Sequence, residues 1–202
     1  EGNSFQGKKI LLAADIDLDG QMWTPIGSWA HPFRGDFDGQ NHLISNLTVS
    51  GETTDGWAGL FGYVSNNVGG WKMAIQNIRI ENAKVLNPSS GGSALIGRLY
   101  AGQGAEVAVQ NCTVMEGSTI GGAIGMLVCD AAAQVTVQNI DSSCTMKTGG
   151  RGGGICGKGE FHSEFTYKEN KESAGNITIK ECTFEGTLKG TGRYGAFGGI
   201  IS

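Results

Sequence analysis

The chain has 202 residues, a formal net charge of −4 and 17% charged residues, which argues against binding to nucleic acid or to an anionic membrane. Its 35 glycines lack the three-residue period of collagen, and 39% of the residues are hydrophobic, which is enough to form a core and excludes a disordered chain. No stretch approaches about 18 consecutive apolar residues, so we expect no transmembrane segment in this sequence.

Residues 1–38 precede a repeating region and contain two of the four tryptophans, Trp23 and Trp29, while Trp57 and Trp71 follow soon after. We expect this segment to form an N-terminal cap over the first repeat, with the tryptophans packed in the core. A sugar stacked on an exposed tryptophan is the alternative interpretation.

The segment DIDLDG places Asp15, Asp17 and Asp19 at alternate positions before Gly20, as in the first half of a calcium-binding loop. The second half of that motif is missing, since Ile26 stands where a bidentate glutamate is required. We therefore expect no bound metal and interpret the three carboxylates as the solvent face of an early strand, with calcium binding as the weaker alternative.

A pattern repeats five times from residue 39 to the end of the sequence. Each copy has a strand-like segment with one polar anchor residue, followed after a variable loop by a small apolar block that ends in glycine. The anchors are 28 to 42 residues apart, a spacing typical of solenoids and arrays, whose single repeats cannot bury their own apolar face. We expect one domain over residues 1–202, with the cap at 1–38 and the repeats at 39–202. The anchors are Asn46, Asn77, Asn111, Asn139 and Glu181, and the blocks are GLFG (59–62), ALIG (94–97), AIG (123–125), GICG (154–157) and AFG (196–198).

Every second residue is apolar in segments such as VAVQNCTV (107–114), which predicts strands, and no segment has a helical period. In a parallel stack, each strand lies over the same strand of the previous repeat. We predict an all-β parallel β-helix or solenoid of about five coils. An antiparallel sandwich or propeller is the alternative, which the scarcity of Asn-Gly hairpin turns disfavours. The stack would align the asparagine anchors in one hydrogen-bonded column with a spacing of about 4.8 Å: Asn46, Asn77, Asn111 and Asn139.

The five cysteines include no CxxC pair and no histidine at metal-ligand spacing, so we expect no zinc and no cofactor. Cys112 and Cys182 follow an anchor, where the other repeats have Leu47, Ile78 and Ile140. We therefore expect buried free thiols in aliphatic positions, with a disulfide framework as the alternative.

The longest segment between repeats, residues 158–175, is polar, charged and aromatic. Exposed aromatic side chains suit protein and sugar partners, so we predict a binding surface here. An ordinary inserted loop, or a flap over the open end of the stack, is the alternative. The predicted contact residues are Phe161, His162, Phe165, Tyr167 and Lys168.

The run from ILLAADIDLDG (10–20) through PFRGDFDGQNHLISNLTV (32–49) to GLFGYV (59–64) resembles bacterial cell-surface proteins that carry the GLUG repeat. GLFG matches the motif that gives the repeat its name, while the later copies keep the small apolar residues and the final glycine. Together with the rule that parallel crossovers are right-handed, this resemblance implies a right-handed solenoid. It also implies an exported surface or adhesin-like protein, in which such a region is often one module among several. The sequence lacks an initiator Met and stops at GGIIS, where a repeat has just closed, so we expect it to be a fragment of a longer surface protein.

We predict a non-catalytic adhesion or ligand-display module that is extracellular or on the bacterial cell surface, with a glycan, a host protein or a matrix protein as partner. A carbohydrate-active enzyme, either a polysaccharide lyase or a hydrolase, is one alternative. Its catalytic carboxylates should share a repeat position, and the acidic residues of the middle repeats do not. No HExxH, GxSxG or Cys-His pairing is present. A purely structural stalk is the second alternative.

Overall fold

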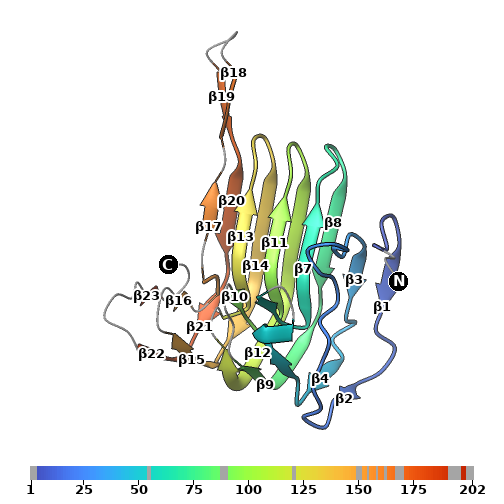
Figure 1. Cartoon of the computed structure of the whole chain (residues 1–202), viewed down its shortest axis with the longest axis vertical. Coiled ribbons are helices and arrows are strands. Elements are labelled where there is room, and N and C mark those ends of the chain that lie inside the picture. The colour runs from blue at the N-terminus through green and yellow to red at the C-terminus, as the bar shows by residue number, and fades with distance from the viewer. Residues whose placement is uncertain are drawn as a thin grey trace.

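The computed structural model is all-β, and its strands are mostly parallel (Figure 1). It describes residues 4–53, 56–86, 91–119, 122–148, 152–153, 155–157, 159–161, 163–166, 171–190 and 197–198. Within these residues the single helical element is a short 3₁₀ helix, η1, at Gly51–Thr53. No helix in the same part of the chain is long and apolar enough to cross a membrane.

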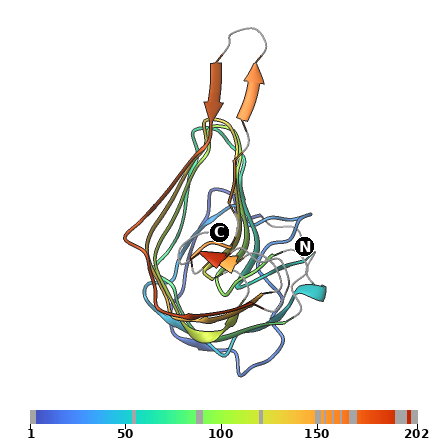
Figure 2. The same ribbon diagram turned by 90° about the vertical axis from the view of Figure 1, so that its left-hand side faces the viewer.

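The largest sheet has 13 strands and curls around the core (Figure 2). Two of its strands, β12 and β14, run through the bend and pair with strands on both sides of it. The first side contains β1 (Lys9–Leu11), β3 (Asp36–Asp38), β8 (Lys72–Gln76), β12 (Glu106–Thr119), β14 (Gln134–Ser142) and β20 (Asn176–Lys180). The second side contains β2 (Ile16–Asp17), β4 (Leu43–Ser45), β5 (Thr48–Ser50), β9 (Arg79–Leu86), β15 (Thr145–Thr148), β21 (Thr183–Phe184) and β22 (Thr187–Gly190).

A four-stranded parallel sheet covers the remaining side of the core, with β7 (Phe61–Asn66), β11 (Ile96–Ala101), β13 (Ile124–Cys129) and β17 (Gly159–Phe161). Two short parallel pairs complete the parallel strands: β6 (Trp57–Ala58) with β10 (Gly91–Gly92), and β16 (Gly152–Gly153) with β23 (Phe197–Gly198). Of the pairs described, one is antiparallel. It joins β18 (Ser163–Thr166) to β19 (Lys171–Ala174) in a hairpin that projects outward, beyond the turns at the narrow end of the molecule (Figures 1 and 2).

The strands that one repeat contributes form a layer, and successive layers stack in register. Ile75, Val109 and Val137 lie side by side in β8, β12 and β14, and all three side chains are fully buried. Because alternate side chains of a strand point to opposite faces, equivalent positions of each layer meet in the same column. The core is therefore continuous from layer to layer. A matching buried column on the four-stranded sheet consists of Phe61, Ile96 and Ile124.

The predicted N-terminal cap adds a further layer in the same parallel register. β1 pairs with β3, β2 pairs with β4, and isolated parallel bridges continue the pairing as far as Phe33. The expectation that the tryptophans pack in the core is wrong for Trp29, which is 58% exposed, and for Trp71, which is 38% exposed. Both side chains lie outside the stacked strands, where the inward columns do not reach.

The five anchor residues share a left-handed backbone conformation, with φ between 52° and 58°. Asparagine enters this region more readily than most residues with a side chain. Asn111, for example, lies at the bend within β12, between the part that pairs with β8 and the part that pairs with β9. The recurring asparagine therefore marks a corner where the chain changes direction. The residues in this conformation are Asn46, Asn77, Asn111, Asn139 and Glu181.

Close backbone contacts explain two of the glycines that end the apolar blocks. A Cβ atom on Gly97 would lie 2.8 Å from the nitrogen of Ala58 and 2.9 Å from the oxygen of Gly62. A Cβ atom on Gly62 would lie 2.6 Å from the oxygen of Gly27. No side chain fits where these segments cross, so glycine is required at both positions.

The five cysteines are free, as predicted, and all but Cys182 are buried. Cys112 pairs with Ile140 of the neighbouring strand, so a thiol fills an aliphatic position of the core. Burial raises the pKa of the Cys112 thiol to about 12, which keeps its sulfur protonated at neutral pH.

We expect Gly97→Ala to lower the free energy of unfolding by about 3 kcal/mol, since the added Cβ meets backbone atoms that cannot rotate away. Gly70→Ala is the matched control, because nothing lies within 4 Å of its added Cβ. Only its φ of 75° opposes that substitution, at a cost of about 1–2 kcal/mol. Equilibrium denaturation followed by circular dichroism measures both variants. Equal losses of unfolding free energy in Gly97→Ala and Gly70→Ala would contradict the steric explanation.

Candidate binding groove

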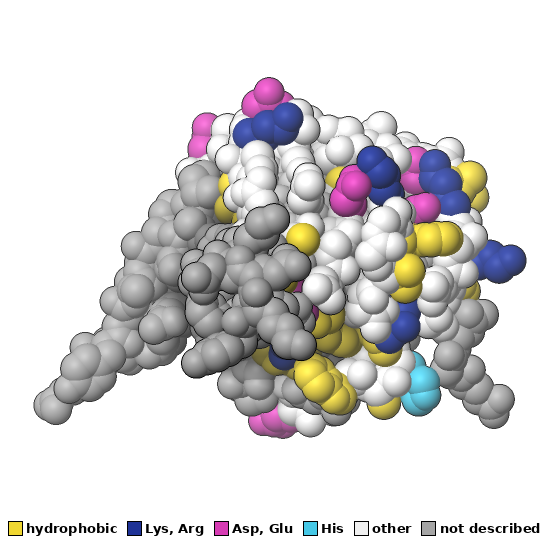
Figure 3. Space-filling model, turned by 90° about the horizontal axis from the view of Figure 1, so that it is seen from above, with side chains coloured by type: hydrophobic (Ala, Val, Ile, Leu, Met, Phe, Trp, Pro, Cys, Tyr) yellow, Lys and Arg dark blue, Asp and Glu magenta, His cyan; other side chains and the backbone are white. Residues whose placement is uncertain are grey.

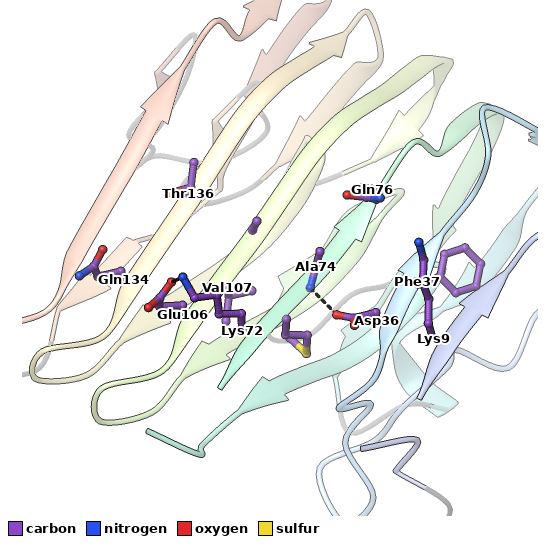
Figure 4. A pocket seen from close by; sticks show the side chains of 12 residues that line it. Lys9, Asp36, Phe37, Lys72, Ala74, Gln76, Glu106, Val107, Gln134 and Thr136 are labelled. Atoms are coloured by element: carbon purple, nitrogen blue, oxygen red, sulfur yellow. Dashed lines mark hydrogen bonds and ion pairs between the residues drawn. The ribbon is translucent and has the colours of Figure 1, made fainter. Parts of the chain in front are cut away.

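A groove crosses the outer face of the first side of the large sheet (Figure 4). Its residues come from β1, β3, β8, β12 and β14, and its volume is about 340 Å³. The outward positions of these strands alternate with the buried core positions, so the same register that builds the core also aligns the groove. The floor is a column of small residues that are neighbours in the sheet, namely Ala74, Ala108 and Thr136.

Longer polar side chains stand on both sides of this floor. Because short side chains lie between two columns of long ones, the surface is hollowed along the column of small residues. One flanking column consists of Lys72, Glu106 and Gln134, and the other consists of Gln76, Gln110 and Gln138.

The charged side chains of the groove are already engaged. Lys72 Nζ lies 2.9 Å from Glu106 Oε2. Asp36 Oδ1 accepts a hydrogen bond of 2.8 Å from the backbone nitrogen of Ala74, which extends the pairing between β3 and β8. In Figure 3, acidic and basic side chains lie next to one another along one edge of the molecule, and much of the other visible described surface is neither charged nor hydrophobic. The groove is lined by two basic side chains, Lys9 and Lys72, and two acidic ones, Asp36 and Glu106, so its charges balance.

Amide side chains beside the groove hydrogen-bond to one another from strand to strand. Asn111 Nδ2 donates to Asn77 Oδ1 at 3.1 Å, and Asn139 Nδ2 donates to Asn111 Oδ1 at 3.0 Å. The column begins at Asp38, whose Oδ1 accepts from Asn77 Nδ2 at 2.9 Å. The structure thus brings together three of the four predicted ladder residues.

Asn46, the fourth predicted ladder residue, belongs to a different column. Its Nδ2 donates to Asp17 Oδ1 at 2.8 Å, and its Oδ1 accepts from Asn82 Nδ2 at 2.7 Å. The register is the reason, since the pairing of β4 with β9 places Asn46 beside Asn82 and not beside Asn77. The loops between repeats differ in length, so the spacing of the anchors could not reveal that the chain has two such corners.

The carboxylates of the DIDLDG segment bond to separate donors. Asp15 Oδ1 accepts from the Leu43 backbone nitrogen at 2.9 Å and lies 3.0 Å from His42 Nδ1, and these two contacts lower the pKa of Asp15. Asp17 Oδ1 accepts from the backbone nitrogen of Asp19 at 2.8 Å. Within the described ranges, no group of three His, Cys, Asp or Glu residues is arranged to hold a metal ion.

The predicted contact surface in segment 158–175 is largely outside the described residues. His162, Tyr167 and Lys168 lie outside them. Phe161 ends β17, and Phe165 belongs to β18. The hairpin formed by β18 and β19 points away from the end of the stack, unlike the flap that was the alternative interpretation.

The groove itself was not among the predicted sites, although the sequence contains a signal for it. A small residue stands three positions before four of the five anchors, as Ala74, Ala108, Thr136 and Thr178. A residue that recurs at one position of a repeat is as easily explained by packing as by binding. The register and the exposure of these residues show that they line an outer surface.

No protein-family model, curated protein or solved structure matches this chain.

Asp38 connects the groove to the amide column, and its carboxylate is held on several sides. Its Oδ1 accepts from Asn77 Nδ2 at 2.9 Å and from the Gln40 backbone nitrogen at 3.0 Å. Its Oδ2 accepts from Gln76 Nε2 at 2.9 Å and lies 3.2 Å from Lys9 Nζ. These contacts, the Asn77 bond above all, hold the pKa of Asp38 well below its usual range although burial opposes them.

Because the pKa of Asp38 is lower in the folded chain than in the unfolded one, its carboxylate contributes stability above about pH 4 that is lost as the pH falls. We expect Asp38→Asn to be less stable than the parent at neutral pH, and the difference to narrow progressively from about pH 4 to pH 2. Urea denaturation at constant ionic strength across this pH range measures the free energy of unfolding of the parent and of the variant. A difference that stays constant would contradict the prediction.

The corner at Asn111 allows its two roles to be separated. Asn111→Gly removes the amide bonds but keeps the left-handed backbone accessible, and we expect it to cost about 1–2 kcal/mol. Asn111→Ala removes the amide bonds and also disfavours the left-handed backbone, so we expect it to lower the free energy of unfolding by about another 1–2 kcal/mol. Chemical denaturation measures the free energy of unfolding of the two variants. If they are equally stable, the left-handed backbone conformation does not explain why asparagine occupies this position.

Proposed function

We propose that this chain is a right-handed parallel β-solenoid that works as a non-catalytic adhesion or ligand-display module at the bacterial cell surface. The observation that carries the proposal is the groove, which five strands line and where small residues of three successive layers, Ala74, Ala108 and Thr136, are aligned. Right-handedness is supported by the general rule for parallel crossovers. The surface location is supported by the resemblance of residues 10–64 to GLUG-repeat proteins.

The groove suits an extended, uncharged ligand. Its columns repeat at the inter-strand spacing of about 4.8 Å, so a linear glycan or an extended segment of a matrix protein can make a similar contact with each layer. The carboxamide of Gln134 offers both a donor and an acceptor beside the floor of small residues. This combination of an apolar surface with a few placed polar groups is typical of binding sites.

A hydrolase or lyase receives no specific support from this groove. Retaining and inverting glycosidases place two carboxyl groups on either side of the scissile bond. The two carboxylates that line the groove are engaged by different partners, Asp36 by the nitrogen of Ala74 and Glu106 by Lys72. Their contacts fit roles in strand pairing and surface charge pairing.

The proposal predicts that the full chain binds members of a combined panel of glycans and host matrix proteins, and that a bulky residue in the groove prevents this. We expect Ala108→Trp to weaken binding at least about tenfold, because an indole would fill the space above the floor. Thr178→Trp is the matched control, since Thr178 continues the same column on β20 but does not line the groove.

Array binding followed by surface plasmon resonance on the positive ligands measures both variants. If no panel member binds, the adhesion proposal is wrong and a structural stalk explains the chain better. If both variants lose binding equally, the ligand does not occupy the groove.

A further inference from the structure

Four side chains meet on the four-stranded sheet, away from the groove: Trp29, Trp57, Tyr63 and Arg98. The guanidinium carbon of Arg98 lies 5.1 Å from the ring centre of Trp29, 5.0 Å from that of Trp57 and 5.4 Å from that of Tyr63. Tyr63 on β7 and Arg98 on β11 are partners in the sheet register, and Trp57 belongs to β6. We call these four residues the arginine-aromatic cluster.

The loop that carries Trp29 is fixed to β7 on both sides. The Gly27 oxygen accepts from the Tyr63 nitrogen at 3.1 Å, and the Phe33 nitrogen donates to the Tyr63 oxygen at 2.9 Å. The φ of Gly27 is 81°, and a Cβ atom there would collide with the Tyr63 oxygen, so the close approach depends on glycine. The loop therefore holds Trp29 in place over Tyr63, with ring centres 5.4 Å apart, while 58% of Trp29 stays exposed.

The guanidinium of Arg98 has a donor that no described group satisfies. Its Nε is buried and has no hydrogen-bond partner. No carboxylate of the described residues forms an ion pair with Arg98, and the carboxylate of Asp130 accepts a hydrogen bond from the Tyr100 hydroxyl. Aromatic rings stabilise the positive charge through their faces, but they do not replace an acceptor in the plane of the N–H groups.

Charges of both signs act on the buried Tyr63 of this cluster. Burial raises the pKa of the Tyr63 hydroxyl, the charges of Arg98 and Arg34 lower it, and the charge of Asp130 raises it. Arg98 is the cation that lies against the rings of Trp29, Trp57 and Tyr63, so the cluster offers one positive charge beside an exposed indole. This pairing favours an anion with an apolar face.

A purely structural role would account for the stacking but not for the buried Arg98 Nε that has no acceptor. Buried N–H groups without an acceptor are rare in native proteins, because each carries its full desolvation cost. An aromatic surface with unused planar donors is also what recognition of a carboxylate requires, since a guanidinium can bind its two oxygens with parallel hydrogen bonds.

We propose that the arginine-aromatic cluster binds a sugar that carries a carboxylate. The carboxylate would pair with the terminal N–H groups of the Arg98 guanidinium, because its Nε is buried, and the apolar face of the sugar ring would pack on the exposed indole of Trp29. A neutral sugar leaves Arg98 unpaired, and a small carboxylate leaves Trp29 unused. The inference is independent of the groove, which lies on the other sheet and suits an uncharged ligand.

The test compares methyl glucuronoside with methyl glucoside, which differ only at C6, where one has a carboxylate and the other a hydroxymethyl group. We titrate each into the full chain and follow the tryptophan indole N–H signals by NMR. We expect saturable shifts of the Trp29 and Trp57 signals with the glucuronoside, and at least about tenfold weaker binding of the glucoside.

Three variants assign the binding to the cluster. Arg98→Met should abolish the preference for the glucuronoside, and Arg98→Lys should retain only part of it, because an ammonium group lacks the planar fork. Trp29→Ala should weaken glucuronoside binding about tenfold. Trp71→Ala is the matched control, since Trp71 is also exposed but lies outside the cluster, and it should bind like the parent.

Several outcomes would overturn the proposal: equal affinity for the two sugars, an unchanged preference in Arg98→Met, or no saturable shift up to the solubility limit. Acetate or a glutamate peptide that binds as tightly as the glucuronoside would assign the cluster to carboxylates in general and overturn the sugar assignment. If circular dichroism shows that Arg98→Met does not fold, the comparison of the two sugars and the Trp29→Ala variant still test whether the cluster binds the glucuronoside. Ala108→Trp separates the two sites, since it should leave glucuronoside binding unchanged.

Discussion

The structure depends on parallel strands that pair in register from one repeat to the next. Each inner strand satisfies its backbone N–H and C=O groups with the strands on both sides, so the layers cannot slip without breaking many bonds at once. A one-residue shift would also move every core side chain to the outer face. Columns such as Ile75, Val109 and Val137 are therefore apolar throughout, and the thiol of Cys112 is accepted because it is apolar and nearly the right size.

The same constraint determines the residues at the bends. A chain that returns to the same register in every layer must change direction at equivalent points, and the anchors do so with a left-handed backbone. Asparagine suits this position for two reasons. It tolerates the left-handed conformation, and its side-chain amide forms hydrogen bonds with the neighbouring layers, as Asn111 does with Asn77 and Asn139. Glycine serves where two layers approach too closely for any side chain, as at Gly97.

The outer faces are free of these demands and differ from one another. On the large sheet, small and amide residues form a neutral groove over a rigid floor. On the four-stranded sheet, Arg98 stands among aromatic rings beside an exposed Trp29. Both surfaces are built on strands whose backbone the stack holds in place, which limits the entropy lost on binding. One scaffold therefore presents two outer surfaces of different chemistry without a change in its core.

The sequence by itself determined the period of the repeats and the strands, because these follow from local alternation and from positions that recur. It favoured the parallel arrangement and the free thiols, while an antiparallel fold and a disulfide framework were the alternatives. It could not determine which corner each asparagine occupies, since loops of unequal length hide the register, and Asn46 therefore joins Asn82 and not Asn77. Only the tertiary structure decided which outward side chains become neighbours. Trp29 and Arg98 belong to different layers and meet because the strands between them are paired, a long-range relation that no local pattern records.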